Sequence, residues 1–371
     1  MNGVNGRRNG GKRPSMFEVA KIAGVSHQTV SRVVNNSPDV SAATRLKVEQ
    51  AIAQLGYRRS NSARALASNR SRTIGLIASS INYFGPINTL ASIETGIRRH
   101  DMFLSVAIVP EAEFSSHGFR SASRSFSEQD VDAFVFITPT DEMLLAALRM
   151  DAVVPRVILT STHGGVSIAE AVTATGNSHI ALMGIDQSSA MHDIADLLAG
   201  LGHRHAMYVP GPDNWRDAVT RQVSWTRYAN ELSIATHYLH DASWDANDAY
   251  LAVGSAIDEY QAAGEPLPTA IVAANDNQAV GALRALHEHG LRVPQDVSVV
   301  GFDDIPGADN YLPPLTTVRQ RFGELGIGAA KRLLALLGEM EAPQSNHSEH
   351  GVDLVKADLI VRDSTGPAPA R

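Results

Sequence analysis

Two long polar side chains stand four residues apart in a short amphipathic segment near the N-terminus. Residues 27–35 read His-Gln-Thr-Val-Ser-Arg-Val-Val-Asn, and Gln28 and Arg32 share one face if this segment is helical. Glutamine can form two hydrogen bonds to adenine, and arginine two to guanine, at base edges in the major groove of DNA. His27 stands at the N-terminal end, which such a helix directs into the groove. The spacing therefore predicts a base-reading surface of His27, Gln28 and Arg32.

Short hydroxyl and amide side chains surround these three residues. Donors of this kind suit contacts to DNA phosphates, which position a protein without specifying sequence. The candidates in this segment are Ser26, Thr29, Ser31 and Asn35. The alternative interpretation is an ordinary small helical bundle with a polar face.

Three short helices must position this surface. The spacing of apolar residues predicts helices over 16–23, 27–35 and 42–55. Ser26 is placed to cap the second helix, and Gly24 to end the first. The tight turn between these two helices gives a helix-turn-helix pattern.

The charge of the chain is distributed unevenly. Residues 1–70 carry 12 Lys and Arg against 3 Asp and Glu, whereas the remainder carries 20 against 36, for a total of −7. A basic head on an acidic body indicates a nucleic-acid-binding module. A solvated basic tail is the alternative, and residues 1–14 are themselves expected to be disordered.

Several classes of protein are disfavoured by what the sequence lacks. It has no cysteine, which excludes disulfides, zinc fingers and a cysteine nucleophile. No phosphate-binding Gly-rich loop or nucleophile elbow is present, so we expect no enzyme and no cofactor. His203 and His205 lie two apart at the start of a strand and point to opposite faces, so we expect no metal. No apolar N-terminal or membrane-spanning segment is visible, which predicts a cytoplasmic protein without a membrane partner.

Beyond residue 73, short apolar runs alternate with amphipathic segments. Strands are expected at 74–78, 103–109, 133–137, 156–160, 180–185, 205–209, 270–274 and 297–302, and helices at 217–232, 247–262 and 277–289. This alternation predicts an α/β fold with doubly wound parallel sheets. The region is too long for one such unit, so two lobes are expected.

The head can be compared with a known family. The run Ala20-x-x-Ala23-Gly-Val-Ser-His-Gln-Thr-Val-Ser-Arg-Val-Val-Asn35, followed by Val40-Ser41-x-x-Thr44-Arg45 and Gly56-Tyr57, strongly resembles the DNA-binding head of the LacI/GalR family. We also place Met16 among the base-reading residues. The remaining expected phosphate contacts are Ser41, Thr44, Tyr57 and Arg64.

The segment Ser62-Ala63-Arg64-Ala65-Leu66-Ala67 resembles the hinge helix of that family. The resemblance implies that this helix forms on operator DNA, where a leucine wedges between base pairs in the minor groove, and Leu66 matches that leucine. The sequence departs from many members at Arg59-Ser60, where they have Pro-Asn. Alternatively, Leu66 is a linker residue that packs on a lobe.

The resemblance covers residues 15–365, with its most specific stretches at 273–284, 290–304 and 313–317. It implies a two-lobed sensor with the periplasmic-binding-protein fold, in which the chain crosses between lobes near residues 185, 319 and 350. The expected organisation is a tail (1–14), a helix-turn-helix domain (15–60), a hinge helix and linker (61–72), lobe 1 (73–185 and 320–349), lobe 2 (186–319 and 350–365) and a second tail (366–371).

Ligands of open α/β sheets bind beyond the carboxyl ends of the strands, which here carry Ser79, Asn275 and Asp303. The resemblance places further effector-binding residues on the same walls. They are Tyr83, Pro86, Asp217, Arg221, Trp244, Gln320 and Phe322.

The composition of these walls favours a galactoside or related glycoside. The sequence departs from the family at Thr160, where many members carry Asp, and at Ile137, which replaces a polar residue. Asn275 and Asp303 could instead cap the following elements, Trp244 could be a surface anchor and Arg221 an exposed helical residue. We expect Trp225 to be a core residue.

The resemblance implies a homodimeric repressor that leaves a near-palindromic double-stranded operator when a small sugar binds. No leucine heptad follows residue 363, so no tetramer is expected. Three alternatives remain: a regulator that needs a co-repressor, a sugar-binding protein without DNA function, and a sugar-active enzyme.

Overall fold

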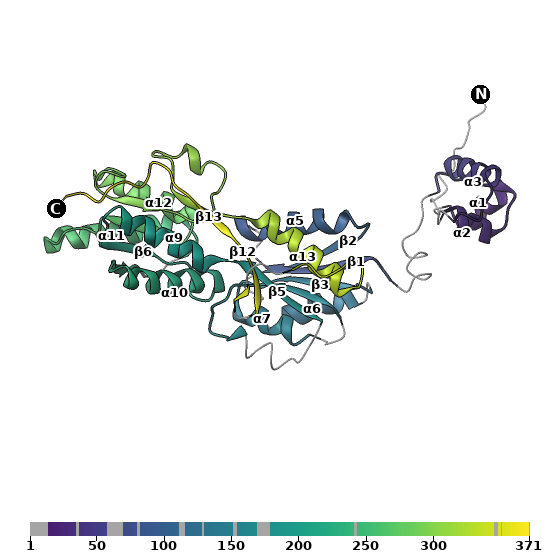
Figure 1. Cartoon of the computed structure of the whole chain (residues 1–371), viewed down its shortest axis with the longest axis horizontal. Helices are drawn as coiled ribbons and strands as arrows, with labels where there is room; N and C mark the ends of the chain where they lie inside the picture. The colour runs from purple at the N-terminus through teal and green to yellow at the C-terminus, as the bar shows by residue number, and fades with distance from the viewer. Residues whose placement is uncertain are drawn as a thin grey trace, which may run out of the picture. The chain divides into compact units, whose positions relative to one another are not determined.

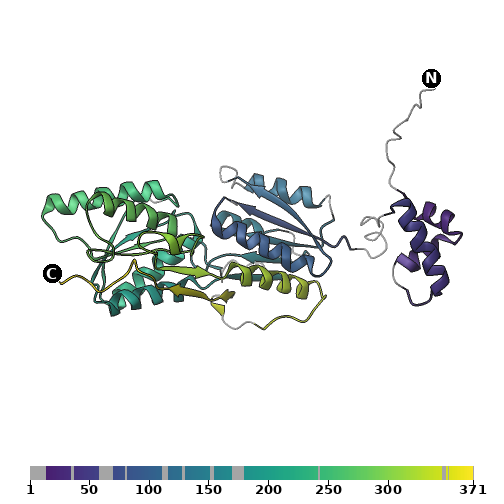
Figure 2. The same cartoon turned by 90° about the horizontal axis from the view of Figure 1, so that it is seen from above.

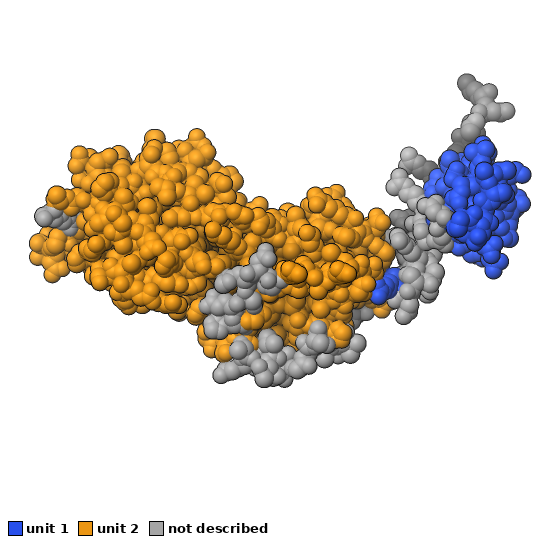
Figure 3. Space-filling view, viewed as in Figure 1, with its two compact units in different colours: residues 1–71 blue, residues 72–371 orange. Residues whose placement is uncertain are grey.

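A computed structural model describes residues 14–34, 37–57, 70–79, 82–110, 116–127, 130–150, 154–168, 179–240, 243–344, 348–349 and 351–370. The chain forms two compact units, residues 1–71 and 72–371 (Figure 3). Each is described here by itself.

The first unit is the predicted three-helix bundle. Its helices are α1 (Met16–Ala23), α2 (His27–Val34) and α3 (Ala42–Leu55) (Figure 1). Gly24 takes the left-handed conformation after α1, with φ of 67°, because the turn into α2 needs it. Val19, Val30 and Val48 are fully buried and join the three helices in one core.

The described residues of the second unit form three sheets. The seven-stranded sheet runs in the order β11-β12-β5-β4-β3-β1-β2, and its strands are parallel apart from the antiparallel pair β11–β12. Its strands are β1 (Thr73–Ser79), β2 (Phe103–Val109), β3 (Ala133–Ile137), β4 (Arg156–Leu159), β5 (Ile180–Ile185), β11 (Ser348–Glu349) and β12 (Val352–Val355). We call this sheet with its helices lobe 1.

The helices of lobe 1 are α5 (Phe84–Arg98), α6 (Ser116–Ser127), α7 (Asp141–Leu148) and α13 (Phe322–Leu336). Helices α5 and α13 lie side by side (Figure 2). They approach so closely that a Cβ on Gly96 would overlap the methyl group of Ala330. Two helices from opposite ends of the sequence therefore cover one face of the sheet together.

Lobe 2 is built on a four-stranded parallel sheet in the order β7-β6-β8-β9. Its strands are β6 (His205–Val209), β7 (Ala235–Tyr238), β8 (Ala270–Ala273) and β9 (Ser298–Val300), and its helices are α9 (Gln187–Gly200), α10 (Arg216–Glu231), α11 (Ala246–Ala263), α12 (Asp276–Glu288) and the 3₁₀ turn η2 (Ala308–Asn310). The strand β7 was not predicted, because its sequence Ala-Thr-His-Tyr has no continuous apolar pattern.

β10 (Thr317–Gln320) and β13 (Ala357–Ile360) form a separate two-stranded antiparallel sheet. Isolated β-bridges, Val300 with Thr316 and Asp303 with Arg319, connect the β10 segment to the end of β9 and the loop after it. The predicted crossing near residue 350 is corrected by the structure. β12 still pairs with β5 in lobe 1, so the chain leaves that sheet after Val355. Alternating burial holds β12 there, with Val352 and Leu354 turned into the core.

The stretch from residue 366 was expected to be a tail, and the structure corrects this as well. The carbonyl of Gly366 accepts a hydrogen bond from His203 Nε2 (3.1 Å), and the Ala368 amide donates to Leu201 O (2.9 Å). Just before them, Ser364 is fully buried and its hydroxyl donates to Val299 O (2.6 Å). These bonds pack the segment against lobe 2.

In the part of the chain that the structure describes, no helix is both long and apolar enough to cross a membrane.

Candidate functional site

Helix α2 presents the predicted base-reading residues on its outer face. Gln28 and Arg32 are exposed, because Val30 and Val33 turn the opposite face into the core. Neither side chain has a hydrogen bond or ion pair within the described residues. Both are therefore free to bond a partner molecule.

His27 is held by an aromatic neighbour that the sequence analysis missed. Its ring stacks on Phe17, with centroids 4.5 Å apart and an interplanar angle of 21°. Phe17 nevertheless stays 71% exposed. The sequence did contain a signal for this contact, because Phe17 is an aromatic residue that lies outside the apolar stripe of α1. Met16, the other predicted base-reading residue of α1, packs partly buried against the core.

The predicted phosphate contacts divide into three groups. Ser26 and Ser41 act as helix caps, since their hydroxyls accept from the amides of Thr29 (3.1 Å) and Thr44 (3.3 Å). Each of these hydroxyls satisfies one amide of its helix N-terminus. Helix N-termini of this kind are favourable sites for a phosphate. Ser31 is partly exposed, whereas Tyr57 is only 8% exposed and belongs to the core. Asn35 and Arg64 lie outside the described residues, and so does Leu66, which was predicted as the minor-groove wedge and not as a phosphate contact.

The second candidate site is a cavity of about 900 Å³ between the two lobes, measured with its opening to solvent. It lies where the strands of both sheets end. Nine of the ten predicted effector residues line it: Tyr83, Pro86, Asp217, Arg221, Trp244, Asn275, Asp303, Gln320 and Phe322. Thr160 and Ile137 line it too. Ser79 is buried but does not reach the wall, and its hydroxyl has no partner among the described residues.

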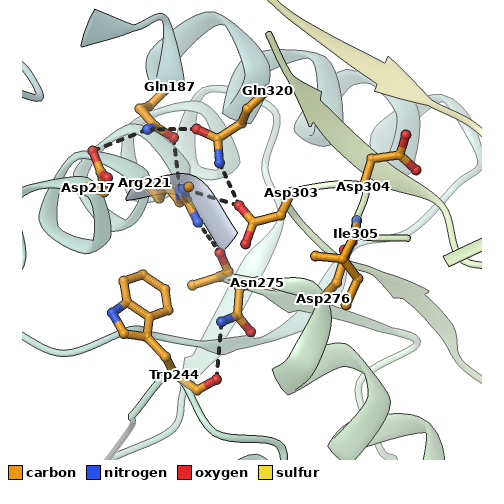
Figure 4. A network of polar contacts seen from close by, with 12 residues as sticks. Gln187, Asp217, Arg221, Trp244, Asn275, Asp276, Asp303, Asp304, Ile305 and Gln320 are labelled. Atoms are coloured by element: carbon orange, nitrogen blue, oxygen red, sulfur yellow. Dashed lines mark hydrogen bonds and ion pairs between the residues drawn. The ribbon is translucent and has the colours of Figure 1, made fainter. Parts of the chain in front are cut away.

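Arg221 is the centre of a polar network in this cavity (Figure 4). Its Nε donates to Gln187 Oε1 (2.8 Å), another nitrogen donates to Ala274 O, and a third lies 3.6 Å from Asp303 Oδ1. The guanidinium also lies over the ring of Phe302, 3.9 Å from its centroid. Arg221 is thus a buried cation with its charge balanced, not an exposed helical residue.

Asp303 is the acceptor at the middle of this wall. Besides Arg221, it accepts a hydrogen bond from Gln320 Nε2 (2.5 Å). Burial raises the pKa of Asp303 to about 7, although Arg221 opposes the shift. Its backbone has a φ of 121°, a conformation that costs energy for a side chain with a Cβ. A strained backbone and a desolvated carboxylate in a cavity wall make Asp303 a candidate functional residue.

Asn275 lines the cavity and also caps a helix, which was the alternative role expected for it. It caps α12, accepting from the Gln278 amide (2.7 Å). Its Nδ2 donates to Trp244 O (3.1 Å), which anchors the loop that carries Trp244. Trp225 is fully buried and its Nε1 donates to Thr236 Oγ1 (3.2 Å), in agreement with a core role.

Polarity differs between the two walls of the cavity. Lobe 2 and the strand β10 supply the charged and amide groups, whereas lobe 1 supplies mainly aromatic and aliphatic side chains. The apolar members from lobe 1 are Tyr83, Phe84, Pro86, Ile137, Pro139, Leu159, Ile185, Phe322 and Leu325.

Trp215 is a cavity residue that the sequence analysis missed. It comes from lobe 2 and meets Tyr83 of lobe 1 edge to face, with centroids 5.1 Å apart. It makes a similar contact with Trp244, at 5.6 Å. Gln187 was missed too, since it follows β5 in sequence but bonds Arg221 and Asp217 across the wall.

His203 has a structural role. It is fully buried, and its two ring nitrogens bond Thr269 Oγ1 (2.8 Å) and Gly366 O (3.1 Å). Burial lowers the pKa of His203, which favours the neutral ring. No group of three His, Asp or Glu within the described residues could hold a metal ion.

Comparison with known proteins gives consistent results. The profile described as bacterial regulatory proteins, lacI family, matches residues 15–60, and that of the periplasmic binding protein-like domain matches residues 195–365. The chain is 32% identical to the lactose operon repressor of Escherichia coli (strain K12) over 356 residues, covering 95% of this chain and 91% of that protein.

Two solved structures match nearly the whole chain. A crystal structure of the lac repressor dimer bound to operator and the anti-inducer ONPF matches with a TM-score of 0.80 and 30% identity, covering 96% of this chain and 100% of that one. A complex of the transcriptional regulator CelR with cellobiose matches with a TM-score of 0.63 and 26% identity, covering 95% of this chain and 100% of that one.

Proposed function

The chain belongs to the LacI family of bacterial regulatory proteins, and on this premise we propose that it is a repressor that leaves its operator when a neutral glycoside binds between its lobes. The observation that carries the proposal is the combination, in one chain, of an unbonded Gln28–Arg32 face on a helix-turn-helix with a cavity walled by Arg221, Asp303 and Gln320. The first reads DNA, and the second senses a ligand.

In the head, Gln28 and Arg32 read base edges, while the helix N-termini capped by Ser26 and Ser41 bind phosphates. His27 and Met16 complete the base-reading set. Leu66 is proposed as the minor-groove wedge on the basis of its family resemblance. These base and phosphate contacts support operator binding. Because the genome lies in the cytoplasm, we propose that the protein acts there.

The charges of the cavity favour a neutral effector. Arg221 is the single cation among the described lining residues, and its guanidinium is already balanced by Asp303. Asp217 adds another carboxylate on the same wall. A sugar phosphate or a uronate would therefore bring an anion to a wall without a spare positive charge.

The carboxylates and amides suit hydroxyl groups instead. Asp303, Asp217 and Gln320 can accept from or donate to a polyol, while Trp244 and Phe322 offer flat apolar surfaces to a sugar ring. The lac repressor–ONPF and CelR–cellobiose complexes support a glycoside as the effector. We favour a galactoside or a related glycoside.

A second copy of the chain is expected to dock on the free edge of the seven-stranded sheet. There β2 exposes three apolar side chains, Phe103 at 52%, Val106 at 41% and Ile108 at 46%. An uncovered apolar edge strand normally has a partner. A homodimer would present two heads to a near-palindromic operator, as in the lac repressor dimer.

The test uses the purified full-length protein. Its operator is first selected from random duplexes, and a panel of mono- and disaccharides, phosphosugars and uronates is screened by melting temperature, since a bound ligand stabilises the folded protein. We expect a neutral glycoside to raise the melting temperature and weaken operator binding in a fluorescence anisotropy titration. Stronger operator binding would identify a co-repressor instead.

No turnover of the bound glycoside is expected, because the cavity carboxylates are bonded to Arg221, Gln187 and Gln320 rather than free to act as acid and base. Release of free sugar from a bound glycoside would contradict this. Failure to select any DNA sequence would contradict the role of the head.

A further inference from the structure

Arg216 is the first residue of α10 in lobe 2, yet its guanidinium is bonded to lobe 1. Its Nε donates to Thr160 Oγ1 (3.0 Å), and its Nη2 to Ser161 O (3.0 Å). Its Nη1 donates to Val166 O (3.1 Å) and forms an ion pair with Asp141. Only 1% of the side chain is exposed. The guanidinium is therefore enclosed by groups of the other lobe.

The loop that receives Arg216 is shaped around this ion pair. The amides of Gly165 (2.7 Å) and Val166 (3.2 Å) both donate to Asp141 Oδ2, which orients the carboxylate. A Cβ on Gly164 would overlap both Arg216 and Asp141. Lobe 1 thus contains a prepared acceptor site for one arginine.

The two chain neighbours of Arg216 line the cavity. Trp215 forms an isolated β-bridge with Thr140 of lobe 1, and the Arg216 amide donates to Pro139 O (2.7 Å). Asp217 accepts a hydrogen bond from the Ser161 hydroxyl. Three consecutive residues of lobe 2 are therefore attached to lobe 1, and two of them belong to the cavity wall.

We propose that Arg216 is a positioning residue of the effector site: it fixes Trp215 and Asp217 on the wall only while the lobes hold the arrangement seen here. This role rests on the proposed function, and it makes Arg216 the side chain that couples the shape of the effector site to the relative position of the two lobes. A ligand that contacts Trp215 and Asp217 then favours this arrangement through its higher affinity for it. Arg216 itself is not available to the ligand, because its nitrogens are engaged in lobe 1.

The composition of the chain allows a direct test without any ligand. The full-length protein has three tryptophans and no cysteine. Labelling with 5-fluorotryptophan gives three ¹⁹F resonances, which Trp215→Phe and Trp244→Phe assign. Nitroxide labels at Glu142→Cys on α7 and Val223→Cys on α10, both exposed, report the distance between the lobes by pulsed electron paramagnetic resonance.

We expect a single interlobe distance in the parent protein and an additional, different distance in Arg216→Met. The Trp215 resonance should shift in this variant, whereas the resonance of Trp225, which is stacked on Tyr208 inside lobe 2, should not. Arg216→Lys should recover part of the original distance because it keeps the charge. The matched control is Arg227→Met on the same helix, whose guanidinium forms an ion pair with Glu231 of lobe 2, and it should change neither measurement.

A lower melting temperature of Arg216→Met with an unchanged distance and an unchanged Trp215 resonance would overturn the proposal, because Arg216 would then serve stability alone. If Arg216→Met does not fold, Asp141→Asn decides, since it removes the charge of the partner but keeps its shape. The same additional distance is expected there, and its absence would overturn the proposal. These measurements involve neither DNA nor sugar, so a failure of the proposed function would appear separately, in the operator titration.

Discussion

The polar side chains of the head and those of the cavity are in opposite states. Gln28 and Arg32 are exposed and have no partner within the described residues. In the cavity, by contrast, Arg221, Asp303 and Gln320 are bonded to one another and to the backbone. The head can gain bonds from its ligand without losing any, whereas the cavity must exchange internal bonds for ligand bonds.

This difference has an energetic consequence. Removing an exposed head residue takes away only the contact with DNA. Removing a cavity residue leaves its former partners unsatisfied inside the protein, which costs stability even without a ligand. Substitutions in the two regions should therefore separate binding from folding.

The largest effect is expected for Arg221→Met. The variant leaves the buried Asp303 carboxylate without its cation and Gln187 Oε1 and Ala274 O without their donor. At a pH above 7, where Asp303 is ionised in the parent protein, the free energy of unfolding should therefore fall by about 3–5 kcal/mol. Urea denaturation of the full-length protein measures it. The control, Arg227→Met, removes an exposed pair on the same helix and should cost less than about 1 kcal/mol. Equal losses would remove the contrast between buried and exposed sites.

Asp303→Asn should weaken binding of the effector that the sugar screen identifies. We expect a loss of about 1.5–3 kcal/mol in binding free energy, roughly 10- to 100-fold in affinity, because a charged acceptor is lost. Operator binding without the effector should stay unchanged. A variant that responds normally to the sugar would remove Asp303 from the site.

The pH dependence of the same residue provides a second measurement. The pKa of Asp303 is raised from 3.8 to about 7 by burial, with Asp276 and Asp217 adding to the shift and Arg221 opposing it. The folded protein therefore holds a proton that the unfolded chain releases at lower pH, and this stabilisation is lost as pH rises through about 7. Effector affinity should change in the opposite sense and rise with pH, because the carboxylate is the better acceptor. Both trends should be absent in Asp303→Asn.

Arg32→Ala tests the head. It should cost about 1–3 kcal/mol of operator binding at one base position and leave unfolding by urea nearly unchanged. Gln28→Ala should relax a different position, which makes each variant the control of the other. A uniform loss over all operator sequences would show that Arg32 contacts phosphate instead.

The smallest effect is expected for Phe17→Ala. Loss of the stack on His27 should weaken operator binding by about 0.5–1.5 kcal/mol. His27→Ala and the double variant complete a mutant cycle measured by anisotropy. Additive losses would mean that the stack does not orient His27.

The two regions also differ in how far sequence reasoning could reach. The head helices were predicted closely, because their caps, Ser26 and Gly24, and their apolar stripes are local signals. Most strands of the body followed from apolar runs. The short strands β7, β10, β11, β12 and β13 did not. β7, β10, β12 and β13 pair with strands far away in the sequence, and β11 has only two residues.

The cavity residues were predicted in two ways, from the positions of strand ends and from the family resemblance. Asp303 and Asn275 were found because strand ends are ligand sites in this fold class, and Arg221 and Trp244 through the family resemblance. Trp215, Gln187 and Arg216 were missed, because their roles arise only when the beginning of α10 meets lobe 1 and the beginning of α9 meets the same wall. No local pattern distinguishes them from ordinary residues at a helix N-terminus.

The order of the elements along the chain has a consequence for biosynthesis. Lobe 1 needs β12, and lobe 2 needs the buried Ser364, so neither lobe is complete until the ribosome has translated almost the whole sequence. The three helices of the head, in contrast, are all encoded before residue 60. Domains fold as units during synthesis, with the N-terminal one first. A nascent chain can thus carry a folded DNA-reading head well before the body that regulates it can respond to any sugar.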